Sequence, residues 1–157
     1  MTTETKKQFT FRISQANATE MIVILYDMAL QYLEDAGELA EKDFAGYQAD
    51  VRRAGACIQE LLRSLHMEYE PAGALRQLYL FCLRRLSQAE ARRHPEFLTE
   101  VSGILIPLRD AYSRIAGQNT DGPVMQNAQT VYAGLTYGKN TLTENMADQG
   151  MNRGMLV

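Results

Sequence analysis

The sequence lacks the residues on which most catalytic and metal sites depend. Its 157 residues include no tryptophan, two cysteines and two histidines, His66 and His94. Neither histidine belongs to a Glu-x-x-His pair, and the sequence has no Cys-x-x-Cys pair and no glycine-rich phosphate-binding loop. These absences argue against a ferritin-like di-iron bundle and a nucleotide-binding enzyme. We therefore expect no cofactor, no metal site and no catalysis.

A histidine phosphorelay bundle is the catalytic alternative that the two histidines leave open. Such a bundle presents its phosphoacceptor histidine from the exposed middle of a helix. His66 and His94 both fall at predicted helix ends. An enzyme or phosphorelay protein would therefore need one of them to be exposed and modified, with loss of function on His→Gln.

Basic charge is also scarce, because 16 lysines and arginines face 19 acidic residues and the net charge is −3. A nucleic-acid-binding protein needs a concentrated basic face to neutralise phosphates, so we expect no nucleic-acid partner. The cysteines Cys57 and Cys82 fall in two different predicted helices. We interpret them as buried thiols in a reducing compartment, with a disulfide as the alternative.

No apolar run is long enough to cross a membrane. The longest candidate, "MIVILYDMALQYL" over residues 21–33, has 13 residues, whereas a spanning helix needs about 20. The first residues, "MTTETKKQFTFRIS", are polar and lack the apolar core of a signal peptide. The sequence therefore predicts a cytoplasmic protein without membrane insertion.

Apolar residues make up 46% of the chain, enough for a buried core, and they recur at spacings of three and four almost everywhere. The spacing predicts an all-α protein, an antiparallel four-helix bundle joined by short turns. The expected helices cover about residues 18–41, 45–65, 74–92 and 95–115. The bundle domain is expected over 17–117, with an N-terminal arm over 1–16 and a weakly helical tail over 118–157.

Two local signals refine these helices. Asn17 is expected to cap the first helix, with Glu20 completing a capping box. Pro107 lies inside the last helix, where its ring would press on the carbonyl group of Gly103, so a kink or break is expected there.

The helix over residues 18–41 carries an apolar arc that covers half of its circumference or more, wider than one core face requires. Either this helix is the most central one, packed on both sides by the bundle and the tail, or it forms part of an apolar groove for a partner segment. Both interpretations hold if the chain's own tail or arm covers the groove until a partner displaces it. The helix over 74–92 also has surplus apolar residues, among which Leu80 and Leu83 are candidate partner contacts.

Four stretches, in this order, resemble the flagellin export chaperones of the FliS family. They are "ISQANATEMIVILYDMAL", "LRSLHMEYE", "LYLFCLRRLSQA" and "IPLRDAYSRI". The resemblance covers about residues 9–117. In the first stretch the family pattern is matched by Ile13, Ala16, Glu20, Ile22, Leu25, Tyr26, Asp27 and Ala29. Departures include Met28, where the family usually has glycine, and His66, where it usually has aspartate.

The resemblance implies a clamp that binds the disordered C-terminal segment of flagellin, prevents its premature polymerisation and delivers it to the export apparatus, whose components are further candidate partners. It places the client contacts on the arm and the first bundle helix, at Ile13, Ile22, Leu25, Tyr26, Met28 and Ala29. Asp27 is expected to hold a backbone amide or an arginine of the third bundle helix. The tail, especially residues 124–142, is a hypothetical client mimic. The alternative function is a structural bundle whose apolar faces self-associate.

Overall fold

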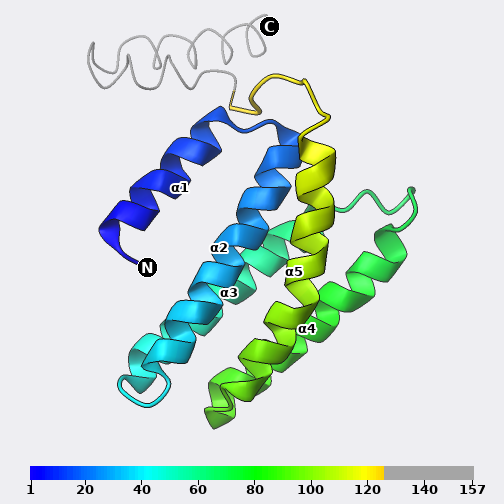
Figure 1. The fold of residues 1–157 in the computed structure, drawn as a ribbon. Coiled ribbons are helices and arrows are strands. Elements are labelled where there is room, and N and C mark those ends of the chain that lie inside the picture. Colours follow the sequence, from blue (N-terminus) through cyan, green and yellow to red (C-terminus); the bar gives the residue numbers. More distant parts are fainter. Residues whose placement is uncertain (126–157) are drawn as a thin grey trace, which may run out of the picture.

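The computed structural model describes residues 1–125, and these form five helices, α1 (Thr3–Gln15), α2 (Ala18–Leu39), α3 (Phe44–Arg63), α4 (Ala72–Arg92) and α5 (Glu96–Ala116). Helices α2 to α5 run alternately up and down, and each packs against its two neighbours around the bundle (Figure 1). The predicted all-α four-helix bundle is confirmed. Within the described residues, no helix is long and apolar enough to cross a membrane.

The core of the bundle follows the predicted apolar stripes. On α3 the stripe of Tyr47, Val51, Ala54, Ile58 and Leu61 is almost completely buried. Cys57 and Cys82 are both free and buried, so the interpretation as buried thiols is confirmed and no disulfide joins them. Burial raises the pKa of each thiol to about 11, which keeps both protonated at neutral pH.

The start of α2 has the predicted capping box. The Asn17 side chain accepts a hydrogen bond from the Glu20 amide at 2.9 Å, and the Glu20 carboxylate accepts one from the Asn17 amide at 2.9 Å. The Asn17 side-chain nitrogen also lies 3.4 Å from the carbonyl oxygens of Asn119 and Asp121. One buried residue therefore starts the central helix and holds the chain that leaves α5.

Replacing Asn17 with alanine should lower the free energy of unfolding by about 1–2 kcal/mol, because one orphan amide of the first turn loses its acceptor. Urea unfolding followed by circular dichroism measures the change. Asn17→Ser is the matched control, since it keeps a capping oxygen but loses the amide nitrogen. Equal losses in both variants would show that the contacts to Asn119 and Asp121, and not the cap, stabilise this end.

The sequence predicts a kink or break at Pro107, and of these the break does not occur, because α5 continues without interruption from Glu96 to Ala116. Pro107 is exposed, and Gly103, four residues earlier, is also exposed with open space where a side chain would begin. Because both residues are exposed, water can reach the Gly103 carbonyl group, which receives no amide hydrogen from Pro107.

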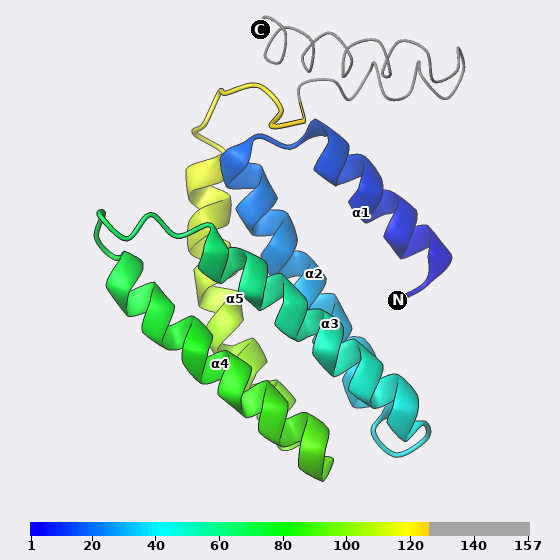
Figure 2. The same ribbon diagram turned by 180° about the vertical axis from the view of Figure 1, so that it is seen from behind.

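The N-terminal arm is itself a helix, which the sequence analysis did not predict. The Thr2 side chain caps α1 by accepting the Thr5 amide at 3.1 Å. Helix α1 lies outside the bundle and packs along α2, at the edge farthest from α4 (Figures 1 and 2). Its C-terminal end joins α2 through Ala16 and Asn17, both in extended conformation.

After α5 the chain returns to this α1–α2 junction. The Asn119 side chain donates to the Thr19 hydroxyl at 2.8 Å, and the Val124 amide donates to the Ala16 carbonyl at 2.8 Å. Residues 118–125 thus connect the C-terminal end of α5 to the start of α2. The hypothetical client mimic over 124–142 lies almost entirely outside the described residues, which end at 125.

Candidate functional site

Helix α2 is buried on two separate sides. One side carries Tyr26, Ala29, Leu33 and Ala36, which lie in the bundle core with at most 2% of their surface exposed. The other side carries Ile24, which is buried in a second cluster with Phe9 and Ala16. The wide apolar arc therefore serves two packing surfaces, and α1 is the element that covers the second one.

The second surface of α2, here called the covered face, consists of Met21, Ile24 and Met28. Helix α1 packs onto it with Phe9 and Ile13, four residues apart as one helical face requires, and Ala16, the extended residue after the helix, joins the same cluster. Met28 contacts both this small cluster and the bundle core. Among residues 1–125, α1 and the flanking residues Met1 and Ala16 cover this face. Moving this N-terminal segment would expose the face and leave the four-helix core in place.

A charged group holds α1 beside the covered face. Asp27 of α2 accepts a hydrogen bond from Arg12 of α1 through Oδ2 at 2.7 Å, and from Arg109 of α5 through Oδ1 at 2.7 Å. The Asp27 side chain is 14% exposed. Its hydrogen bond raises the pKa of the Arg109 guanidinium. The partners of Asp27 are thus arginines of α1 and α5, which corrects the expected arginine of the third bundle helix or backbone amide.

Between α1 and α5 the surface is hollowed along α2. Three adjacent hollows have volumes of about 360, 340 and 630 Å³. The first two share Arg12, and the last two share Leu30, Glu34 and Ile106. Exposed Phe11 lines the first hollow, and exposed Ile106 lies where the second and third hollows meet. The groove next to α1 is therefore partly apolar, and the Asp27 ion pairs cross it.

Two of the predicted contact residues lie inside the bundle. Tyr26 and Ala29 have no exposed surface. The Tyr26 hydroxyl is hydrogen-bonded to the Tyr79 hydroxyl of α4, and the Tyr26 ring centre lies 5.8 Å from that of Tyr112 on α5. Burial raises the pKa of both Tyr26 and Tyr79, for Tyr79 to about 12, so both phenols stay neutral. In this conformation neither Tyr26 nor Ala29 can touch a partner.

The other predicted contact residues are half-buried and are spread over several surfaces. Ile13 lies on the side of α1 that packs on α2, Leu25 packs on the bundle core, and Met28 belongs to the covered face. Leu80 and Leu83 lie on α4, across the bundle from α1 (Figure 2). The structure therefore does not bring the α4 pair together with the α2 residues.

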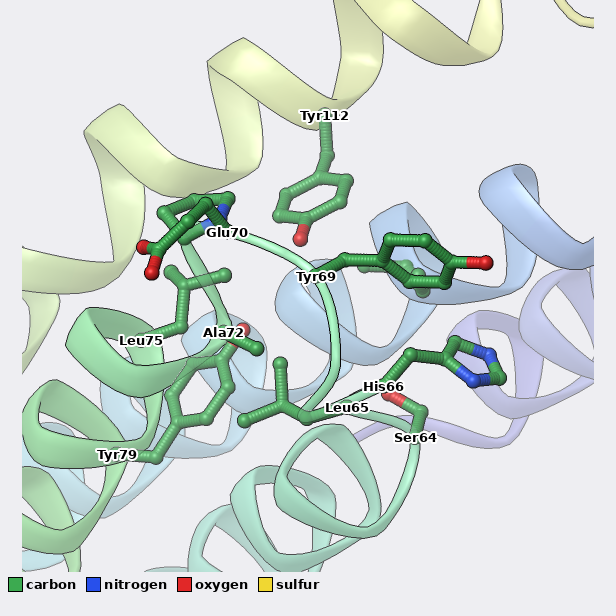
Figure 3. Close-up of a pocket in the computed structure, with 11 residues that line it drawn as sticks. Ser64, Leu65, His66, Tyr69, Glu70, Ala72, Leu75, Tyr79 and Tyr112 are labelled. Atoms are coloured by element: carbon green, nitrogen blue, oxygen red, sulfur yellow. The ribbon is translucent and has the colours of Figure 1, made fainter.

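Ile22 lines a separate cavity of about 190 Å³ at the end of the bundle where the α3–α4 loop crosses. Its other walls include Leu75, Tyr79 and Tyr112, and Figure 3 shows Tyr112 pointing from α5 toward the loop. His66 stands on this loop with 78% of its side chain exposed. Over residues 1–125, no group of three or more acidic, histidine or cysteine side chains is arranged to hold a metal ion.

Sequence reasoning missed Phe9, Arg12 and Ile24, which make the contact between α1 and α2. A usable signal was present, because Phe9, Ile13 and Ala16 repeat at helical spacing. The polar residues around them hid the pattern. Ile24 is not among the residues that match the family pattern, although its neighbours Ile22 and Leu25 are.

Comparison with known proteins agrees with this architecture. The family model described as flagellar protein FliS matches residues 1–119, which include all five helices. The flagellar secretion chaperone FliS of Bacillus subtilis (strain 168) is 27% identical over 103 residues, covering 65% of this chain and 77% of that relative. The match confirms the resemblance seen in the sequence motifs, and the chain belongs to the FliS family of flagellar proteins.

Proposed function

We propose that this chain is a flagellar secretion chaperone that binds the C-terminal segment of flagellin on the covered face of α2 in the cytoplasm. The observation that carries the proposal is the position of α1, an amphipathic helix that lies on an apolar face outside the bundle core. A face that accepts one helix by apolar contacts can accept another of similar pattern. In the free protein α1 takes the place of the client.

The physical chemistry of the covered face suits a client that must be held and later released. Two of its three side chains are methionines, Met21 and Met28. Methionine is flexible and polarisable, so such a face adapts to different apolar side chains. A disordered client that folds as it binds loses ordering entropy, which keeps the complex reversible. This function is binding alone and requires no cofactor and no catalytic step.

The predicted contact residues take different parts in this proposal. Met28 contacts the client directly, and the half-buried Ile22 and Leu25 extend the surface along α2. Ile13 belongs to α1, the helix that shields the covered face in the free protein. Tyr26 and Ala29 support the surface from within the core. Leu80 and Leu83 on α4 form a second apolar patch, where a client long enough to pass around the bundle would make further contacts. Components of the export apparatus are the expected later partners.

Titration calorimetry with a peptide of the flagellin C-terminal segment from the same organism should show saturable 1:1 binding. Met28→Glu should weaken it at least about tenfold, since a carboxylate would be desolvated in an apolar contact. Leu78→Glu is the matched control, because Leu78 is a partly exposed apolar residue on α4, away from α2. It should leave the affinity within about twofold, a difference that corresponds to less than 0.5 kcal/mol.

Absence of peptide binding would contradict the proposal. If neither the full chain nor a chain that lacks residues 2–15 binds the peptide, flagellin is not the client of this face. Light scattering would then test the alternative, in which two copies pair through their apolar surfaces. A dimer that persists on dilution and is not dissociated by flagellin peptide would support self-association.

A further inference from the structure

Asp27 pairs with two arginines, one from inside the bundle and one from outside it. Arg109 belongs to α5, inside the bundle, and pairs with Oδ1 at 2.7 Å. Arg12 belongs to α1, outside the bundle, and pairs with Oδ2 at 2.7 Å. If α1 leaves the covered face, Asp27 keeps Arg109 and loses Arg12. With α1 in place the Asp27 side chain is 14% exposed. A client helix that takes the same place would again shield Oδ2 from water, and this oxygen would then need a partner from the client.

We propose that the client helix that replaces α1 brings its own arginine or lysine to Asp27 Oδ2, so that Asp27 is a specificity-determining residue of the client surface. This inference rests on the proposed function. Arg12 stands in for the client cation in the free protein. The partner is accordingly a basic amphipathic helix, with one apolar residue three positions before the cation and another one position after it. In α1 the same pattern is Phe9, Arg12 and Ile13.

The charges around Asp27 support a cationic partner. The hollow beside Arg12 is lined by Asp27, Glu34 and Asp110, with Arg109 as the cation from the bundle. Arg109 is engaged by both Asp27 and Asp110, at 2.7 and 3.1 Å. The site therefore keeps surplus negative charge when Arg12 is absent. That surplus attracts a basic helix and disfavours an acidic one.

The need for a client cation at Asp27 Oδ2 also distinguishes one apolar segment from another. Apolar contacts with Met21, Ile24 and Met28 depend on size and shape, and many helices satisfy them. A carboxylate that is 14% exposed is satisfied only by a donor at a fixed place along the helix. A segment without that donor would leave Oδ2 desolvated and unpaired, which lowers its affinity. Asp27 thus adds register and selectivity to a surface that is otherwise permissive.

A double-mutant cycle tests the proposal. Each arginine and lysine of the flagellin peptide is replaced by alanine, and each peptide is titrated against the unmodified chain and against Asp27→Asn. One replacement should weaken binding to the unmodified chain about tenfold or more, as expected for a charge-assisted hydrogen bond, and should have almost no effect on Asp27→Asn. For each protein variant, the original and the replaced peptide are compared on the same chain. Any change in how α1 docks therefore affects both affinities equally and cancels.

Asp110→Asn is the matched control, because it removes one carboxylate from the same hollow without touching α1. The sensitive peptide cation should keep its effect in this variant. If Asp27→Asn does not fold, as judged by circular dichroism, the charge-neutral pair Asp27→Asn with Arg109→Gln replaces it, since that pair also removes the bundle arginine that Asp27 holds. The same loss of coupling is expected there.

Each outcome decides a different point. Coupling of one client cation to Asp27, and not to Asp110, supports the proposal. Tight peptide binding in which no cation couples to Asp27 overturns it and leaves the proposed function intact. Absence of peptide binding to the unmodified chain and to the chain without residues 2–15 overturns both.

Discussion

Replacing Tyr26 with alanine should lower the free energy of unfolding by about 3–5 kcal/mol, the range for removing a large buried aromatic side chain. Tyr26 has no exposed surface and lies where α2, α4 and α5 meet. Its loss leaves a cavity between three helices and a buried Tyr79 hydroxyl without its partner. Urea unfolding followed by circular dichroism measures the change.

Tyr26→Phe separates the ring from the hydroxyl. It keeps the apolar volume and removes the hydrogen bond to Tyr79, so we expect a loss of about 1–2 kcal/mol. The same variant should bind flagellin peptide as well as the unmodified chain does, because the hydroxyl points into the core. A weaker affinity with unchanged stability would instead show that the client reaches the Tyr26 hydroxyl in the bound state.

Deleting residues 2–15 should raise the affinity for the flagellin peptide by about 10- to 100-fold. Such a gain is expected if α1 leaves the covered face open only about 1–10% of the time, since apparent affinity falls in proportion to the open fraction. The range corresponds to a docking free energy of about 1.4–2.7 kcal/mol, comparable with the burial of one large apolar side chain such as Phe9. Titration calorimetry on both chains measures the gain.

A pair of point variants on α1 provides the matched control. Phe9 is 8% exposed against α2, whereas Phe11, two residues later, is 61% exposed. Phe9→Ala should give part of the gain in affinity, because the cover loses its main anchor. Phe11→Ala should give none. Weaker client binding by the deleted chain and by Phe9→Ala would show that α1 is part of the client site and not its cover.

Local patterns were sufficient to predict the bundle. The capping box at Asn17 and Glu20 and the stripe from Tyr47 to Leu61 depend on neighbours in the sequence, and both appear in the structure. Helix α1 was not predicted, because its polar residues surround only a short apolar stripe. A 13-residue helix of that composition is marginal by itself and gains its stability by packing on α2.

The candidate site was harder to predict because it depends on contacts between distant segments. The width of the apolar arc on α2 correctly indicated a second packing surface. Periodicity alone could not show that Tyr26 and Ala29 face the core while Ile24 faces α1. The partners of Asp27 lie 15 and 82 residues away in the chain. Only the packed arrangement of α1, α2 and α5 brings them together.

The junction between α1 and α2 also receives the segment that follows α5. Helix α1 has 13 residues, a length of about 20 Å, and ends at the extended pair Ala16 and Asn17. The Ala16 carbonyl accepts a hydrogen bond from the Val124 amide. A departure of α1 from α2 would therefore also change the surroundings of the segment that leaves the bundle, since both meet at the same two residues.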